Sequence, residues 1–104
     1  MHMNKIKIGW KTYDIRKVEP QQTLFVGGNE CYGTIDYVNQ VIDINSKCDD
    51  EQSKATLIHE VIHGVSDMYA LKFDEDTVGR LGDALYTLLK DNNLEIKYFN
   101  KESE

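Results

Sequence analysis

Two histidines flanking a glutamate are the residues of this chain best suited to chemistry. His59, Glu60 and His63 form the pattern His-Glu-x-x-His. Apolar residues recur around them at three- and four-residue steps, which predicts an α-helix. Residues four apart share one face of a helix, so both imidazoles can bind one metal ion. The pattern therefore predicts a Zn²⁺ site with His59 and His63 as ligands and Glu60 as the general base that takes a proton from water.

A third protein ligand is needed, because catalytic zinc sites normally have three and leave one position for water. The remaining histidine, His2, is far away in sequence, so a carboxylate is expected. Glu75 is favoured, since a second helix running back along the first brings its first turn beside the histidines. Asp67 is also a candidate acceptor for an imidazole N–H. The acids that stay open as alternative ligands are Asp67, Asp74, Asp76 and Asp83.

Three glycines within the expected helices indicate close contact between those helices. Glycine inside a helix costs about 1 kcal/mol relative to alanine, so a close approach would explain its presence. The residues concerned are Gly64, Gly79 and Gly82.

The elements expected around the motif follow from hydrophobic period and turn residues. Alternation predicts a hairpin or two bent strands over 5–18 and a clear hairpin over 32–45 with one face buried and the other wet. Residues 24–26 are interpreted as a short strand or as an apolar anchor before a turn. Asp49 and Asp74 are expected to cap helices of about 50–69 and 74–91. Weak alternation over 94–99 predicts a last short strand. The fold predicted is α+β, a small antiparallel sheet packed on two antiparallel helices.

Composition narrows the function classes. The chain has 104 residues, 40% of them hydrophobic and 29% charged, with one proline, which predicts a single ordered domain over 1–104. A formal charge of −6 and the lack of a basic cluster argue against a nucleic-acid partner. No stretch reaches the ~20 apolar residues of a membrane span, and no secretory signal is visible, so a cytoplasmic protein is expected.

The two cysteines do not indicate a second metal site. Cys31 and Cys48 are not in a C-x-x-C pair, and a structural zinc site needs four close ligands. They are interpreted as thiols in a reducing cytosol.

A resemblance to a known family rests on three segments. These are the hairpin start Tyr32-Gly33-x-Ile35-Asp36-Tyr37, the run from Leu57 to Gly64, and Glu75-x-x-Val78-x-Arg80-Leu81. Together they resemble the small metallopeptidase-like proteins of phages and Gram-positive bacteria, which look like minimal zincin domains of the ImmA/IrrE type. The resemblance covers roughly residues 5–91. It implies His59 and His63 as zinc ligands, Glu60 as the catalytic glutamate, and Glu75 as the downstream helix glutamate.

The resemblance also bears on the substrate. Proteins of the ImmA/IrrE group cleave repressor proteins in regulatory switches, which implies a peptide or protein substrate and a phage or prophage origin. Several of them carry a helix-turn-helix or sensor domain, and neither is expected in this chain.

The function predicted is zinc-dependent hydrolysis of peptide bonds. An extended peptide is expected to add to an exposed sheet edge. A tyrosine would suit as a second donor to the reacting oxygen, and the choice among Tyr32, Tyr37, Tyr69 and Tyr86 stays open. The alternatives are a catalytically weak or inactive zincin-like protein-binding module and an interaction protein with no metal.

Overall fold

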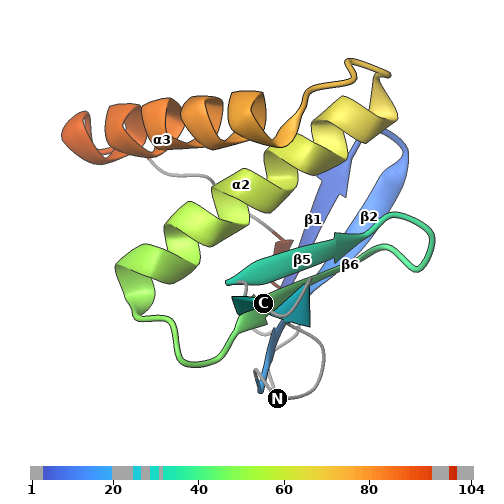
Figure 1. The fold of residues 1–104 in the computed structure, drawn as a ribbon, viewed down its shortest axis with the longest axis horizontal. Helices are drawn as coiled ribbons and strands as arrows, with labels where there is room; N and C mark the ends of the chain where they lie inside the picture. The colour runs from blue at the N-terminus through green and yellow to red at the C-terminus, as the bar shows by residue number, and fades with distance from the viewer. Residues whose placement is uncertain (1–3, 20–24, 27–28, 31, 95–98, 101–104) are drawn as a thin grey trace.

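The structure, a computed structural model, is α+β as predicted (Figure 1). It describes residues 4–19, 25–26, 29–30, 32–94 and 99–100. The strands are β1 (Asn4–Ile8), β2 (Lys11–Val18), β3 (Phe25–Val26), β4 (Asn29–Glu30), β5 (Gly33–Asp36), β6 (Val41–Asn45) and β7 (Phe99–Asn100). The helices are α2 (Asp50–Met68) and α3 (Glu75–Asp91).

The main sheet joins the two predicted hairpins through a parallel pair of strands. Its five strands lie in the order β5-β6-β2-β1-β7. Strands β1 and β2 are antiparallel, as are β5 and β6, but β2 and β6 are parallel, with Ile15 opposite Ile42. The prediction of a wholly antiparallel sheet is therefore wrong at this junction. Alternation in a sequence shows which residues share a face and carries no information on the direction of a non-consecutive neighbour.

Strand β6 is buried on both faces, which differs from the expected wet face. Ile42, Asp43, Ile44 and Asn45 are all buried. Strand β6 lies between β5 and β2, and α2 packs against one of its faces. Asp43 accepts hydrogen bonds from Arg16 Nε at 2.8 Å and Nη2 at 3.1 Å. A buried carboxylate is tolerated here because a guanidinium binds both of its oxygens.

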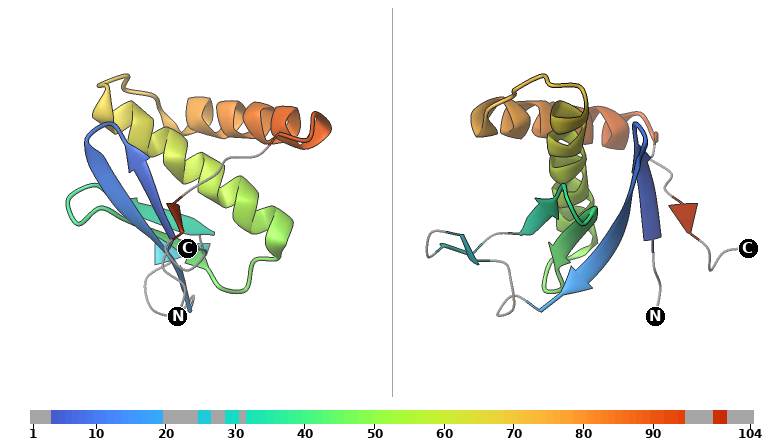
Figure 2. Two further views of the ribbon diagram at one scale, coloured as in Figure 1. Left: turned by 180° about the vertical axis from the view of Figure 1, so that it is seen from behind. Right: turned by 90° about the vertical axis from the view of Figure 1, so that its right-hand side faces the viewer.

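Helix α2 lies between the sheet and α3, so the sheet packs on one helix and α3 covers the other side of that helix (Figures 1 and 2). One apolar cluster fills the space between sheet and helix, with Tyr13, Ile42 and Leu57 among its buried members. A second cluster joins the helices through Ile58, Ile62 and Val78. Each fully buried side chain of this kind contributes roughly 1.5–3 kcal/mol. The two clusters fix α2 from both sides.

Both predicted helix starts are confirmed by their caps. Asp49 accepts a hydrogen bond from the backbone N–H of Gln52 at 2.8 Å, and Asp74 accepts one from that of Thr77 at 2.8 Å. Each helix also carries two acidic residues in its first turn, where the helix dipole favours negative charge. The cap at Asp74 sets where α3 begins and hence where Glu75 stands.

The glycine interpretation is wrong at two positions. A Cβ atom on Gly64 would lie 2.7 Å from Ile8 Cδ1, so this glycine allows close contact of α2 with the sheet and not with α3. A Cβ on Gly79 would meet nothing within 4 Å. Only Gly82 faces α2, where a Cβ would lie 3.7 Å from His59 Cα, an ordinary contact distance.

Three other predictions involve residues of which the structure describes only a part. The last strand is present as β7, which pairs with β1, while residues 95–98 lie outside the description. Of the expected strand at 24–26, Phe25 and Val26 form β3, and Leu24 lies outside the described residues. Cys48 is buried, and Cys31 is not among the described residues. Within the ranges described, neither helix has the length and apolar character to cross a membrane.

Candidate metal centre

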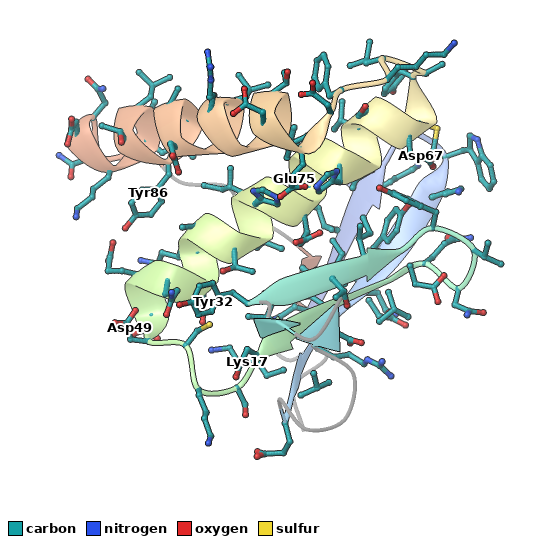
Figure 3. The ribbon with its side chains drawn as sticks, in the orientation of Figure 1. Lys17, Tyr32, Asp49, Asp67, Glu75 and Tyr86 are labelled. Atoms are coloured by element: carbon teal, nitrogen blue, oxygen red, sulfur yellow. The ribbon has the colours of Figure 1, made fainter. Side chains whose placement is uncertain are left out.

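His59, His63 and Glu75 meet in space. The histidines stand one turn apart on α2, with ring centroids 5.0 Å apart. Glu75 comes from the first turn of α3 (Figure 3). Its carboxylate lies between the rings, with Oε2 3.0 Å from His59 Nε2 and Oε1 2.8 Å from His63 Nε2. The carboxylate predicted as third ligand is thus next to both imidazoles.

The connection between the helices positions Glu75. The chain turns at Ala70, where the N–H of Leu71 bonds the carbonyl of Ser66 at 2.9 Å. The hydroxyl of Ser66 accepts a further hydrogen bond from the N–H of Phe73 at 3.0 Å. Phe73 packs against the cluster formed by Ile58, Ile62 and Val78. These contacts bring the start of α3 back to the histidines, and they are not visible as a pattern in the sequence.

The three side chains fit a metal ion. One ligand atom from each lies within 4.8 Å of the other two. A tetrahedral zinc ion with bonds of about 2.0–2.2 Å holds its ligand atoms roughly 3.3 Å apart. The N–O separations of 3.0 and 2.8 Å are those of direct contacts between the two imidazoles and the two oxygens of Glu75, and they are a few tenths of an ångström shorter than this spacing. Two imidazoles and one carboxylate are also the ligand set of one class of catalytic zinc site, which keeps a fourth position for water.

The other acids considered as ligands have different partners or lie apart. Asp67 Oδ2 is 3.6 Å from Lys11 Nζ, and no hydrogen bond joins it to His59 or His63 in the described part of the chain. Its expected role in orienting an imidazole is therefore not observed. Asp74 caps α3 and Asp76 lies 3.1 Å from Arg80 Nε. Asp83 is exposed and, in the ranges described, is not part of the cluster.

Glu60 lies beside the cluster but is not part of it. Its side chain is buried, with 7% of the residue exposed, and it lines a pocket of about 350 Å³ together with His59, His63 and Glu75. Burial and then the negative charge of Glu75 raise the pKa of Glu60 to about 7. A carboxylate that is not a ligand and faces the same pocket can exchange a proton with a molecule held there.

Gly33 allows β5 to lie close to Glu60, and the sequence reasoning gave it no role. A Cβ atom on Gly33 would lie 2.6 Å from Thr56 Cγ2, 3.1 Å from the backbone oxygen of Asp43 and 3.5 Å from Glu60 Cγ. Glycine inside a strand often marks such an approach, so the signal was present in the sequence. Together with Thr34 and Ile35, Gly33 forms the strand wall of the pocket.

Among the tyrosines that the structure describes, Tyr37 lines this pocket. It stands at the start of the β5–β6 turn, where its carbonyl accepts a hydrogen bond from Lys11 Nζ at 3.0 Å. Burial, then the charges of Asp67 and Glu60, raise the pKa of Tyr37, which keeps its hydroxyl protonated. By contrast, Tyr32 and Tyr69 are exposed, and Tyr86 donates a hydrogen bond to Glu51.

Replacing Gly33 with alanine is expected to lower the free energy of unfolding by about 1–3 kcal/mol, because the backbone of β6 cannot move away from the added methyl group. Gly79→Ala is the matched control. It adds the same group in open space within a helix and is expected to stabilise the protein by about 0.5–1 kcal/mol. Urea unfolding of both variants checks this, and a loss of stability in both would contradict the close contact at Gly33.

The resemblance to ImmA/IrrE-type domains stays a prediction from the motif, so the functional assignment depends on the geometry of the centre. No protein-family model, curated protein or solved structure matches this chain.

Proposed function

We propose that this protein is a zinc-dependent hydrolase of peptide bonds. The observation that carries the proposal is the convergence of His59, His63 and Glu75 at one wall of a pocket that also contains the buried carboxylate of Glu60. Two imidazoles and a carboxylate suit zinc, and a separate acid supplies the base that hydrolysis requires.

Each side chain has a defined task in the proposed reaction. His59, His63 and Glu75 would hold a zinc ion, and that ion would supply Lewis-acid chemistry when bound. Glu60 accepts a proton from the attacking water and returns it to the leaving amine. Tyr37 lines the same pocket, and its hydroxyl is the proposed hydrogen-bond donor to the carbonyl oxygen of the substrate.

The position of strand β5 is evidence for a peptide as the substrate. It is the terminal strand of the five-stranded sheet, with β6 on one side, and its residues Gly33, Thr34 and Ile35 line the pocket. An extended peptide that pairs with the outer edge of β5 lies along the pocket and presents its carbonyl groups to the centre. The resemblance to the ImmA/IrrE group suggests a regulatory protein as the natural substrate.

Zinc binding by two amide variants tests the centre. Glu75→Gln keeps the size of the side chain and removes its charge, so zinc affinity is expected to fall by at least about 100-fold, more than is typical for losing an outer partner of a ligand. Asp76→Asn changes the neighbouring acid, which pairs with Arg80 instead, and is expected to keep the affinity of the wild type. Calorimetric titration with zinc and metal analysis of the purified protein measure both.

Two results would contradict the proposal. Equal zinc affinity in Glu75→Gln and the wild type would exclude Glu75 as a ligand. A wild-type protein that binds no zinc would exclude the metal centre and leave an interaction protein as the function.

A further inference from the structure

Three turns meet at one end of the molecule, the right-hand end in Figure 1. They are the β1–β2 turn at residues 9–10, the β5–β6 turn at 37–40 and the α2–α3 connection at 69–74. Lys11 connects the first turn to the second and to the end of α2, just before the α2–α3 connection. Its ammonium group lies 5.4 Å from the Trp10 ring centroid, 3.0 Å from the carbonyl oxygen of Tyr37 and 3.6 Å from Asp67 Oδ2. The turns therefore form one continuous surface, here called the turn surface.

The turn surface is unusually apolar for an exposed region. Of the eight large apolar side chains that are exposed in the described part of the chain, four lie on it. Trp10 is 74% exposed, Val38 85%, Tyr69 60% and Leu71 45%. Single exposed apolar residues are common, but a group of them on adjacent turns indicates a binding surface.

The backbone of these turns is held in defined and uncommon conformations. Left-handed φ angles occur at Gly9 (62°), Gln40 (59°), Ala70 (54°) and Lys72 (60°), which are four of the five such residues in the described ranges. Non-glycine residues adopt this region rarely, and surrounding contacts must stabilise it. Hydrogen bonds do so here, from Thr12 N to Gln40 Oε1 at 3.2 Å and from Leu71 N to Ser66 O at 2.9 Å. The apolar side chains are thus presented by an ordered surface.

A second pocket connects the candidate metal centre to the turn surface. It has a volume of about 280 Å³ and shares His63 and Tyr37 with the first pocket. Ala70, Lys72 and Phe73, from the connection that also carries Tyr69 and Leu71, line its other side. A chain bound at the centre that continues past His63 therefore crosses the second pocket and reaches the turn surface.

We propose that the turn surface binds an apolar segment of the substrate protein, next to the segment held at the metal centre. This inference rests on the proposed function for the identity of the occupant. A second copy of this chain suits the surface less well, because two molecules of net charge −6 repel each other. The surface would select substrates by a stretch of aromatic and aliphatic residues beside the bond that is cleaved.

Fluorescence of Trp10, the one tryptophan of the chain, tests the proposal. The probe is a peptide with a Phe-Leu-Val-Phe block between Gly-Ser-Lys flanks, and its control has Ser at all four apolar positions. Both are titrated into the Glu60→Gln protein, which is expected not to cleave them. The apolar peptide should shift the Trp10 emission to shorter wavelength and saturate, whereas the serine peptide should cause no shift.

Two double variants in the same background locate the binding site. Val38→Ser with Leu71→Ser is expected to weaken binding of the apolar peptide by roughly tenfold or more. Leu81→Ser with Leu88→Ser removes two exposed leucines of α3, away from the turns, and should bind like its parent. Circular dichroism verifies that both variants are folded.

The outcomes separate this proposal from the proposed function. No shift with the apolar peptide, or equal affinity in the two double variants, would overturn the docking role. A Trp10 shift that depends on protein concentration without peptide would assign the surface to a second copy and overturn it too. Peptide binding at Trp10 in a protein that never cleaves peptides would leave the docking role in place and refute hydrolysis.

Discussion

Replacing Glu60 with glutamine is expected to lower peptide hydrolysis by about 10²–10⁴-fold while zinc stays bound. Glutamine keeps the length and shape of the side chain but cannot accept a proton from water. Glu60 is separate from the three groups proposed as ligands, so the metal affinity should not change. The rate of cleavage of a quenched fluorescent peptide and the zinc content of the same sample measure the two effects.

Asp83→Asn is the matched control for this substitution. It makes the same change from acid to amide at an exposed position of α3 outside the cluster, and its activity should equal that of the wild type. Full activity in Glu60→Gln would exclude Glu60 as the base. A wild-type protein that binds zinc and cleaves no peptide would support the alternative of a zincin-like binding module.

The site is largely predictable from sequence where its parts are local. The four-residue spacing of His59 and His63 fixes their shared face, because helix geometry is nearly constant. Asp49 and Asp74 mark both helix starts, since a short polar side chain before an apolar-periodic run satisfies free N–H groups. With Asp74 as the cap, Glu75 falls in the first turn of α3. The short connection between the helices then brings this turn back to the histidines.

The features that were missed depend on contacts between segments distant in sequence. The parallel pairing of β2 with β6 follows from how two hairpins join, which no local pattern encodes. Asp67 has the right spacing to reach an imidazole, yet Lys11 from the start of β2 lies near it instead. Gly64 leaves space for the side chain of Ile8, and Gly33 leaves space for that of Thr56. Neither neighbour can be inferred from the glycine itself. Tyr37 could not be distinguished from the other tyrosines for the same reason.

In the metal-free protein, Glu60 is expected to make stability fall as the pH rises through the acid range. Burial and the charge of Glu75 raise the pKa of Glu60 from 4.5 to about 7 in the folded state. Between these values the unfolded chain releases the proton and the folded protein keeps it, which favours unfolding. The stability contributed by the neutral carboxyl group is thus fully present below pH 4.5 and is lost by about pH 7.

Each pH unit between the two pKa values is worth about 1.4 kcal/mol, so the loss amounts to roughly 3 kcal/mol. Glu60→Gln carries a neutral group at every pH and should not show this loss of stability. Urea unfolding in the presence of a chelator, from pH 4 to 8, gives the free energies of unfolding. The difference between the variant and the wild type should grow by that amount across the range, whereas Asp83→Asn should follow the wild type. Parallel curves for Glu60→Gln and the wild type would mean that Glu60 has the same pKa in the folded and the unfolded protein.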